Sequence, residues 1–166
     1  MSFSAVFGSP GDGTPGGSDD WLLCRAGSFL CALRLTDVVE IMRLLPIEPI
    51  AGAPPFVRGL SIVRGMPTLV VDIAHLLGGR APSPQRQITV KVGTRIVALA
   101  VDSVLGVRSI ETADAINPLP PLLREAASDT VSAIGRLDTD LLLFLDTARI
   151  VPDSLFESLD TPEAVA

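Results

Sequence analysis

Short apolar segments separated by frequent glycine and proline constrain the fold of this chain most strongly. The 14 glycines and 14 prolines make up about a sixth of the 166 residues, against about an eighth in an average protein. Neither residue is favoured inside a helix or a strand, so such frequent breaks favour many short strands over long helices. Hydrophobic residues reach 48 %, which excludes a wholly disordered chain. The sequence therefore predicts an all-β protein with short helices.

The charge balance argues against one broad class of partner. The chain has 13 Lys and Arg against 19 Asp and Glu, a net charge of −6. A nucleic-acid-binding protein usually has a basic patch, and no basic cluster occurs here, so we expect no nucleic-acid partner. The apolar runs are far shorter than the ~20 residues of a membrane-spanning helix. Residues 1–20 lack the basic start and apolar stretch of a secretion signal and are predicted to be a flexible acidic tail. We therefore expect a cytoplasmic protein without direct membrane insertion.

A hairpin is the first predicted structural unit. Segments 21–26 and 29–35 flank Gly27 and Ser28, a pair suited to a two-residue turn. In that register Cys24 faces Cys31 directly. A redox pair is conceivable, but cytosolic thiols normally stay reduced, so two small buried residues are the preferred interpretation. With one His and two Cys a zinc site would need carboxylates, and we expect neither a metal nor a cofactor.

The rest of the chain alternates between short strands and breaks. Residues 36–43 are predicted as a short helical turn or a bend, and 113–127 as mostly loop. In 87–92 apolar and polar residues alternate strictly, which predicts a half-exposed strand with Gln87, Thr89 and Lys91 on the open face. Residues 78–86, rich in Gly and Pro, are predicted to be a linker. Further strands are predicted at 56–64, 68–73, 95–101, 104–110, 131–137 and 141–145.

These strands predict two small packed units. Each half of the chain offers four or five strands, too few to bury a large core alone, so the two halves should pack together. The first β-barrel is expected at about 21–77 and the second at about 87–147. Residues 153–166 are predicted to be an acidic tail.

Patterns that would indicate catalysis are weak. No phosphate-binding glycine loop or dinucleotide motif occurs. Ser61 does not lie in a Gly-x-Ser-x-Gly turn, and His75 lies in an apolar stretch where a packed imidazole is expected. Asp138 and Asp140 flank one Thr between apolar strands and are expected to serve the turn. We therefore expect no catalytic residues.

One segment resembles an enzyme signature. The run Phe144-Leu-Asp-Thr-Ala148 is similar to the Asp-Thr-Gly motif of aspartic proteases. Those enzymes need two carboxylates that share a proton, and here Asp146 would be one of them. Ala148 stands at the Gly position, and an aspartic-protease-like enzyme remains a remote alternative.

Several ordered segments share a pattern with a known adaptor domain. They are Val38-Val-Glu-Ile41, Pro54-Pro-Phe-Val-Arg-Gly-Leu-Ser-Ile-Val-Arg-Gly65 and Leu69-Val-Val-Asp-Ile73, followed by Val101-Asp-Ser-Val104 with Val107, Ile116-Asn-Pro-Leu-Pro120 and the closing apolar strand 141–145. In this order they resemble the CheW-like domain of bacterial chemotaxis. The resemblance covers about 21–152 and implies two intertwined SH3-like five-stranded β-barrels, in agreement with the predicted strands.

The resemblance implies a non-enzymatic signal-transduction adaptor. It would join the cytoplasmic tip of methyl-accepting receptors to the regulatory domain of the chemotaxis histidine kinase, and would be recruited to receptor arrays. In the family the receptor lies in an apolar groove between the barrels, and the matching positions are Val38, Glu40, Gly59 and Arg64. An amphipathic helical hairpin needs such a groove, and an arginine at its rim can bind carboxylate or backbone oxygens.

Structural roles for the same residues stay open. Val38 and Gly59 could serve barrel packing, and Arg64 could pair with Glu40 or Asp72.

Departures from the family pattern motivate a second hypothesis. Ile62, Leu69 and Ala74 stand where the family commonly has Asn, Pro and Arg. They are compatible with a divergent CheW-like adaptor that binds the receptor without normal kinase coupling.

Overall fold

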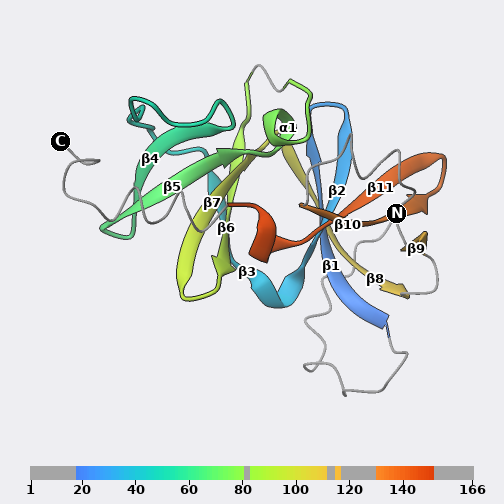
Figure 1. Ribbon diagram of the computed structural model, residues 1–166. Helices are drawn as coiled ribbons and strands as arrows, with labels where there is room; N and C mark the ends of the chain where they lie inside the picture. Colours follow the sequence, from blue (N-terminus) through green and yellow to red (C-terminus); the bar gives the residue numbers. More distant parts are fainter. Residues whose placement is uncertain (1–17, 81–82, 112–114, 117–129, 152–166) are drawn as a thin grey trace.

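The computed structural model describes residues 18–80, 83–111, 115–116 and 130–151, mostly as short strands (Figure 1). Its helices are single turns: η1 (Leu35–Asp37), α1 (Ile73–Leu76) and η3 (Thr147–Arg149). The all-β prediction with short helices is confirmed. The strands are β1 (Ser18–Ala26), β2 (Phe29–Arg34), β3 (Val38–Arg43), β4 (Val57–Val63), β5 (Met66–Asp72), β6 (Arg86–Val92), β7 (Arg95–Val101), β8 (Ser103–Glu111), β9 (Ala115–Ile116), β10 (Val131–Leu137) and β11 (Asp140–Leu145).

Three predicted segments lie largely outside the described residues: the tails 1–17 and 152–166, and most of 113–127. β1 begins at Ser18 rather than Trp21, because residues 18–20 pair with the end of β8. The described helices are too short and insufficiently apolar to cross a lipid bilayer.

The strands form two sheets that lie side by side (Figure 1). One has six strands in the order β8-β1-β2-β11-β10-β9, and the other has five in the order β3-β6-β7-β5-β4. Each contains one parallel pair, β2 with β11 and β5 with β7. The chain thus leaves the first sheet after β2 and returns to it with β8. This interleaving agrees with the intertwined SH3-like fold predicted above, although the described strands do not close either sheet into a continuous barrel.

The boundary between the two units differs from the prediction. Strands β3 to β5, expected in a first barrel at 21–77, share their sheet with β6 and β7. The expected linker 78–86 therefore joins two elements of one sheet, and the crossing to the other sheet occurs after β7. Pairing of strands distant in sequence explains the error, since a parallel pair needs a long crossover that local turn signals do not reveal.

Both sheets contribute to a single main core. Its fully buried side chains include Leu22 and Leu33 from the six-stranded sheet and Ile88 and Leu99 from the five-stranded sheet. The first hairpin has the predicted register, with Cys24 opposite Cys31, and both thiols are buried and free. The two sheets are therefore held together by shared apolar packing.

β6 is buried on both faces over residues 87–90, so the predicted open face is wrong for Gln87 and Thr89, whereas Lys91 is exposed as predicted. Gln87 and Thr89 are only 0 % and 1 % exposed. The backbone N–H of Leu45 donates to Oε1 of Gln87 at 3.3 Å, and Thr89 Oγ1 donates to the carbonyl oxygen of Glu40 at 3.2 Å. Internal hydrogen bonds thus satisfy the polar side chains that alternation assigned to solvent.

Candidate functional site

Glu40 lies in β3, an edge strand of the five-stranded sheet. Burial alternates along the strand, with Val39 and Ile41 exposed and Val38, Glu40 and Met42 partly buried. The pairing of β3 with β6 shifts register between Val38 and Glu40. The Thr89 hydroxyl anchors the backbone at Glu40 from the neighbouring strand. The backbone of β3 therefore holds the Glu40 carboxylate in a defined position.

Arg64 and Gly65 form the turn between β4 and β5. Their φ angles are 48° and 79°, so both residues adopt the left-handed conformation. A two-residue hairpin turn of the type I′ class requires this conformation at both central positions. Arg64 is one of two described non-glycine residues with positive φ, an uncommon backbone state. The turn presents a guanidinium whose side chain is 77 % exposed.

A two-point ion pair joins this turn to β3. Nε of Arg64 donates to Oε2 of Glu40 at 2.9 Å, and Nη2 donates to Oε1 at 2.5 Å. These hydrogen bonds, assisted by the opposite charge, lower the pKa of Glu40 and raise that of Arg64. Because β3 and β4 are opposite edges of the same sheet, the pair connects its two ends. One of the two structural alternatives, pairing of Arg64 with Glu40, is what the structure contains.

Asp72 has a different arginine partner. Its Oδ2 accepts from Nε and Nη2 of Arg58 at 2.9 and 2.8 Å, and Oδ1 accepts from the backbone N–H of His75 at 3.2 Å. The latter bond caps α1. The His75 residue is exposed, so the predicted packed imidazole is wrong; Ile73 and Ala74 form the buried face of this single turn.

Gly59 is required by backbone packing. Its φ is 143°, and a Cβ there would lie 2.0 Å from the carbonyl oxygen of Glu48. Next to it, Leu60 and Glu48 exchange two backbone hydrogen bonds of 2.9 and 2.8 Å. The segment between β3 and β4 thus folds back onto β4 at a point where no side chain fits. This supports the packing interpretation of Gly59 and leaves its receptor role a prediction.

Large apolar side chains are exposed on the same two elements that carry the ion pair. In the part of the chain that the structure describes, six large apolar side chains are exposed. Four of them belong to β3 or flank the Arg64 turn: Val39 (48 %), Ile41 (43 %), Ile62 (62 %) and Met66 (67 %). Exposed apolar side chains concentrated on neighbouring elements are typical of a protein interface. We call Glu40, Arg64 and these four residues the β3–β4 surface.

Val38 has a mixed environment. It is partly buried and packs against the main core, as do Val104 and Val107 from β8 of the other sheet. Val38 thus contacts a core to which both sheets contribute, compatible with either a packing role or the edge of an apolar groove.

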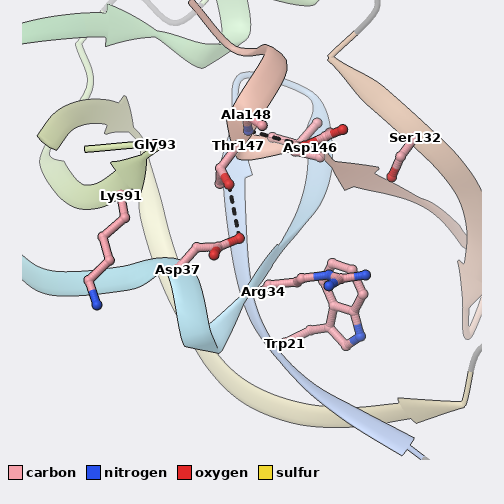
Figure 2. Close-up of a pocket in the computed structure, with 10 residues that line it drawn as sticks. Trp21, Arg34, Asp37, Lys91, Gly93, Ser132, Asp146, Thr147 and Ala148 are labelled. Carbon is pink, nitrogen blue, oxygen red and sulfur yellow. Dashed lines mark hydrogen bonds between the residues drawn. The ribbon is translucent and has the colours of Figure 1, made fainter. Parts of the chain in front are cut away.

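A separate cavity of about 510 Å³ lies where η1 and η3 meet (Figure 2). Thr147 Oγ1 donates to Asp37 Oδ2 at 2.9 Å and closes one side, while the Arg34 guanidinium lies 5.8 Å from the centre of the Trp21 ring. Asp37, which precedes Val38 in the chain, lines this cavity, but the lining is polar and mixed in charge, unlike the apolar groove that the resemblance implies. Its lining includes Trp21, Arg34, Asp37, Lys91, Ser132 and Asp146.

The geometry around Asp146 does not match an aspartic protease. Its Oδ1 accepts from the backbone N–H of Ala148 at 3.1 Å and caps η3, and Arg149 lies 3.6 Å from Oδ2. Asp37 lines the same cavity, but the Thr147 hydroxyl occupies its Oδ2. Among the described residues no carboxylate hydrogen-bonds to Asp146, whereas the protease mechanism needs two carboxylates that share a proton.

The remaining carboxylates singled out from the sequence belong to a turn, as predicted. Asp138 has a φ of 54° at the turn between β10 and β11, and Asp140 forms an ion pair with Arg25 at 3.2 Å. Within the described ranges, no three His, Cys, Asp or Glu residues gather closely enough to hold a metal ion.

A family model for the CheW-like domain matches residues 20–154. The chain belongs to the CheW-like domain family. Two relatives align over most of their length. The Chemotaxis protein CheW of Klebsiella aerogenes is 25 % identical over 135 residues, which cover 80 % of this chain and 81 % of the relative. Protein FrzA of Myxococcus xanthus is 30 % identical over 136 residues, which cover 75 % and 84 %.

A solved structure supports the CheW-like fold. The scaffolding protein TtCheW from Thermoanaerobacter tengcongensis superimposes with a TM-score of 0.66 at 21 % identity. The match covers 78 % of this chain and 89 % of that protein. At this identity the likeness shows the fold alone.

In this CheW-like domain the structure joins two of the four predicted receptor-binding residues directly, Glu40 and Arg64. Val38 and Gly59 lie on the same strands, β3 and β4, but make no bond to the pair. Ile62 and Met66 were not predicted from the sequence to belong to a binding site. No local signal separates them from Val63, which lies directly beside the same Arg64-Gly65 turn and is buried.

Proposed function

We propose that this chain is a non-enzymatic chemotaxis adaptor that couples methyl-accepting receptors to the regulatory domain of a histidine kinase. The observation that carries the proposal is the Glu40–Arg64 ion pair, which joins two strand edges beside exposed apolar side chains. Membership of the CheW-like family and the chemotaxis names of relatives support it. Such an adaptor would work in the cytoplasm at receptor arrays, without inserting into the membrane.

Receptor binding is assigned to Val38, Glu40, Gly59 and Arg64, with different roles. Arg64 uses Nε and Nη2 for Glu40, and its Nη1 donates to no atom of the described residues. That donor is free to reach a carboxylate or carbonyl oxygen on a receptor helix, where a charge-assisted bond is strong. Glu40 holds the guanidinium in place, Val38 offers apolar contact, and Gly59 shapes the strand that leads to the turn.

The kinase domain needs apolar contacts of its own, and the β3–β4 surface offers them on the two sides of the Arg64 turn. Ile62 and Met66 are the two most exposed large apolar side chains of the described residues. An apolar pair of this kind would be covered by a partner's own apolar residues, with exposed charges at the rim. We assign it to the kinase regulatory domain.

The test is a calorimetric titration of the full chain with a receptor hairpin tip from the same genome. Arg64→Glu should weaken binding at least about tenfold, as expected for an interfacial arginine. Arg43→Glu is the matched control, because Arg43 is exposed on the same strand as Glu40, and it should change the Kd less than about twofold. Unchanged affinity in a folded Arg64→Glu protein would refute the role of Arg64.

A charge-swapped double variant separates contact from support. If Arg64 touches the receptor, Glu40→Arg combined with Arg64→Glu restores the ion pair but not the affinity. If the pair only holds the hairpin in place, the double variant recovers binding.

A second candidate function is a receptor-binding adaptor without kinase coupling. The departures from the family pattern at Ile62, Leu69 and Ala74 are the observation that favours it. Titration with the kinase regulatory domain distinguishes the two. Binding that Ile62→Asp weakens supports coupling, and absence of binding with retained receptor affinity supports the second candidate.

A further inference from the structure

The two cysteines of the chain face each other on neighbouring strands. The sequence contains Cys24 and Cys31 and no other cysteine. They lie directly opposite each other in the register of β1 and β2, and on its other side Cys24 lies opposite Val104 of β8. A residue in a sheet has at most two such facing positions, so this placement is not expected by chance. The contacts proposed for the receptor and the kinase use neither cysteine.

The spacing of the two strands suits a disulfide. Residues directly opposite in an antiparallel pair have Cα atoms about 4.5–5.5 Å apart, and their side chains point to the same face. Disulfides usually join residues whose Cα atoms lie about 4.4–6.8 Å apart. The thiols of Cys24 and Cys31 already hydrogen-bond to each other. A bond between the two sulfur atoms therefore fits the strands as they are paired.

The surroundings of the two thiols argue against other common uses of cysteine. Both side chains are 0 % exposed and belong to the main core. A nucleophilic cysteine lies in a partly exposed, electropositive site. A structural zinc site needs four ligands, and within the described ranges no third His, Cys, Asp or Glu gathers with the two cysteines. The chemistry left to the two thiols is reaction with each other.

The strand on the other side of Cys24 pairs irregularly at this point. The register of β1 and β8 shifts between Leu23 and Cys24, so Leu105 of β8 has no residue opposite it. Such a bulge interrupts the ladder of hydrogen bonds and lets the strand bend. A small movement of Cys24 would therefore disturb fewer hydrogen bonds here than in a regular ladder.

We propose that Cys24 and Cys31 form a redox-sensitive cross-link, which a small-molecule disulfide such as oxidised glutathione closes under oxidising conditions. The thiolate of one cysteine attacks the oxidant and forms a mixed disulfide, and one glutathione leaves as a thiol. The other cysteine attacks this mixed disulfide, the bond between Cys24 and Cys31 forms, and the second glutathione leaves. Two electrons pass from the cysteines to the oxidant, and the two cysteine protons end on the released thiols.

The cross-link would tie β1 to β2 inside the core that both sheets share. A disulfide restricts the unfolded chain and so stabilises a fold whose geometry it fits. The mutual hydrogen bond and burial raise the pKa of the Cys24 thiol, so the reduced pair reacts slowly and only sustained oxidation closes the link. The β3–β4 surface contains no residue of β1 or β2, and the proposal does not depend on the receptor or kinase assignments.

The experiment equilibrates the full chain with mixtures of reduced and oxidised glutathione and identifies the products by mass spectrometry after an acid quench. Equilibrium is approached from both sides, from reduced native protein and from protein oxidised in urea and then refolded. The main product should be a monomer lighter by two hydrogen atoms. The effective concentration of the two thiols should be at least about tenfold higher in the native protein than in urea. The oxidised protein should therefore have a higher Tm than the reduced protein.

Cys31→Ala is the matched control. It leaves Cys24 without a partner, so the same mixtures should yield at most a mixed disulfide and no rise in Tm. Four results would overturn the proposal: an effective concentration no higher in the native protein than in urea, an oxidised protein with the same or a lower Tm, a mixed disulfide or a cross-linked dimer as the main product of the unsubstituted chain, or no oxidation in any mixture.

Discussion

Substitution of Gly59 by alanine tests whether this position serves packing. The φ of 143° is a region that only glycine occupies readily, and holding alanine there costs about 1–3 kcal/mol. The new Cβ would lie 2.0 Å from the Glu48 carbonyl oxygen, so the backbone must move. That movement endangers the two Glu48–Leu60 hydrogen bonds, each contributing about 0.5–1.5 kcal/mol. We expect Gly59→Ala to lower the free energy of unfolding by about 2–6 kcal/mol.

Gly52→Ala is the matched control for this experiment. Gly52 also has a positive φ, 77°, but nothing lies within 4 Å of a Cβ built there. Only the backbone strain applies, about 1–2 kcal/mol. Urea unfolding followed by circular dichroism measures both variants. If Gly59→Ala is no more destabilising than Gly52→Ala, the close contact with Glu48 does not constrain the fold and the packing argument fails.

Three further predictions concern buried and charged groups. Asp72→Ala removes a buried carboxylate and the cap of α1. We expect the free energy of unfolding, measured with urea, to fall by about 2–4 kcal/mol. This is less than the full cost of breaking a buried ion pair, because the Arg58 side chain is 31 % exposed. A decrease of less than about 1 kcal/mol in the free energy of unfolding would contradict this role of Asp72. Hydrogen bonding to the facing cysteine and burial raise the pKa of the Cys24 thiol, so Ellman's reagent should react on the order of a hundredfold more slowly with the native than with the urea-unfolded protein. Similar rates would show that the thiols are accessible. Because Arg64 lowers the pKa of Glu40, the pair contributes stability at neutral pH and loses it as the pH falls through that lowered pKa. Arg64→Gln should raise the Glu40 pKa in an NMR titration, and an unchanged value would mean that the ion pair is absent in solution.

Local patterns predicted the hairpins correctly, because turn residues fix both the loop and the register. Gly27 and Ser28 placed Cys24 opposite Cys31, and the structure confirms this pairing. The sheet assignment failed where strands distant in sequence pair in parallel. No local signal specifies that β5 joins β7 while β2 joins β11.

Burial was harder to predict than strand position. Alternation in β6 identified the strand, but Gln87 and Thr89 are buried because the segment after β3, with Leu44 and Ile47, covers the face assigned to solvent. At the candidate site the resemblance identified Glu40 and Arg64, which prove to be bonded to each other. Ile62 and Met66 could not be assigned to a surface from the sequence, since exposure depends on what packs against the hairpin in three dimensions.

Coupling is the central claim, and a co-sedimentation assay tests it most directly. Receptor tips displayed on a solid support are mixed with the kinase regulatory domain, with and without this protein. The account predicts that the kinase domain sediments only when the protein is present, and that Arg64→Glu abolishes the effect while Arg43→Glu does not. Retention of the protein on the receptor tips without the kinase domain, or retention of neither, would contradict the account.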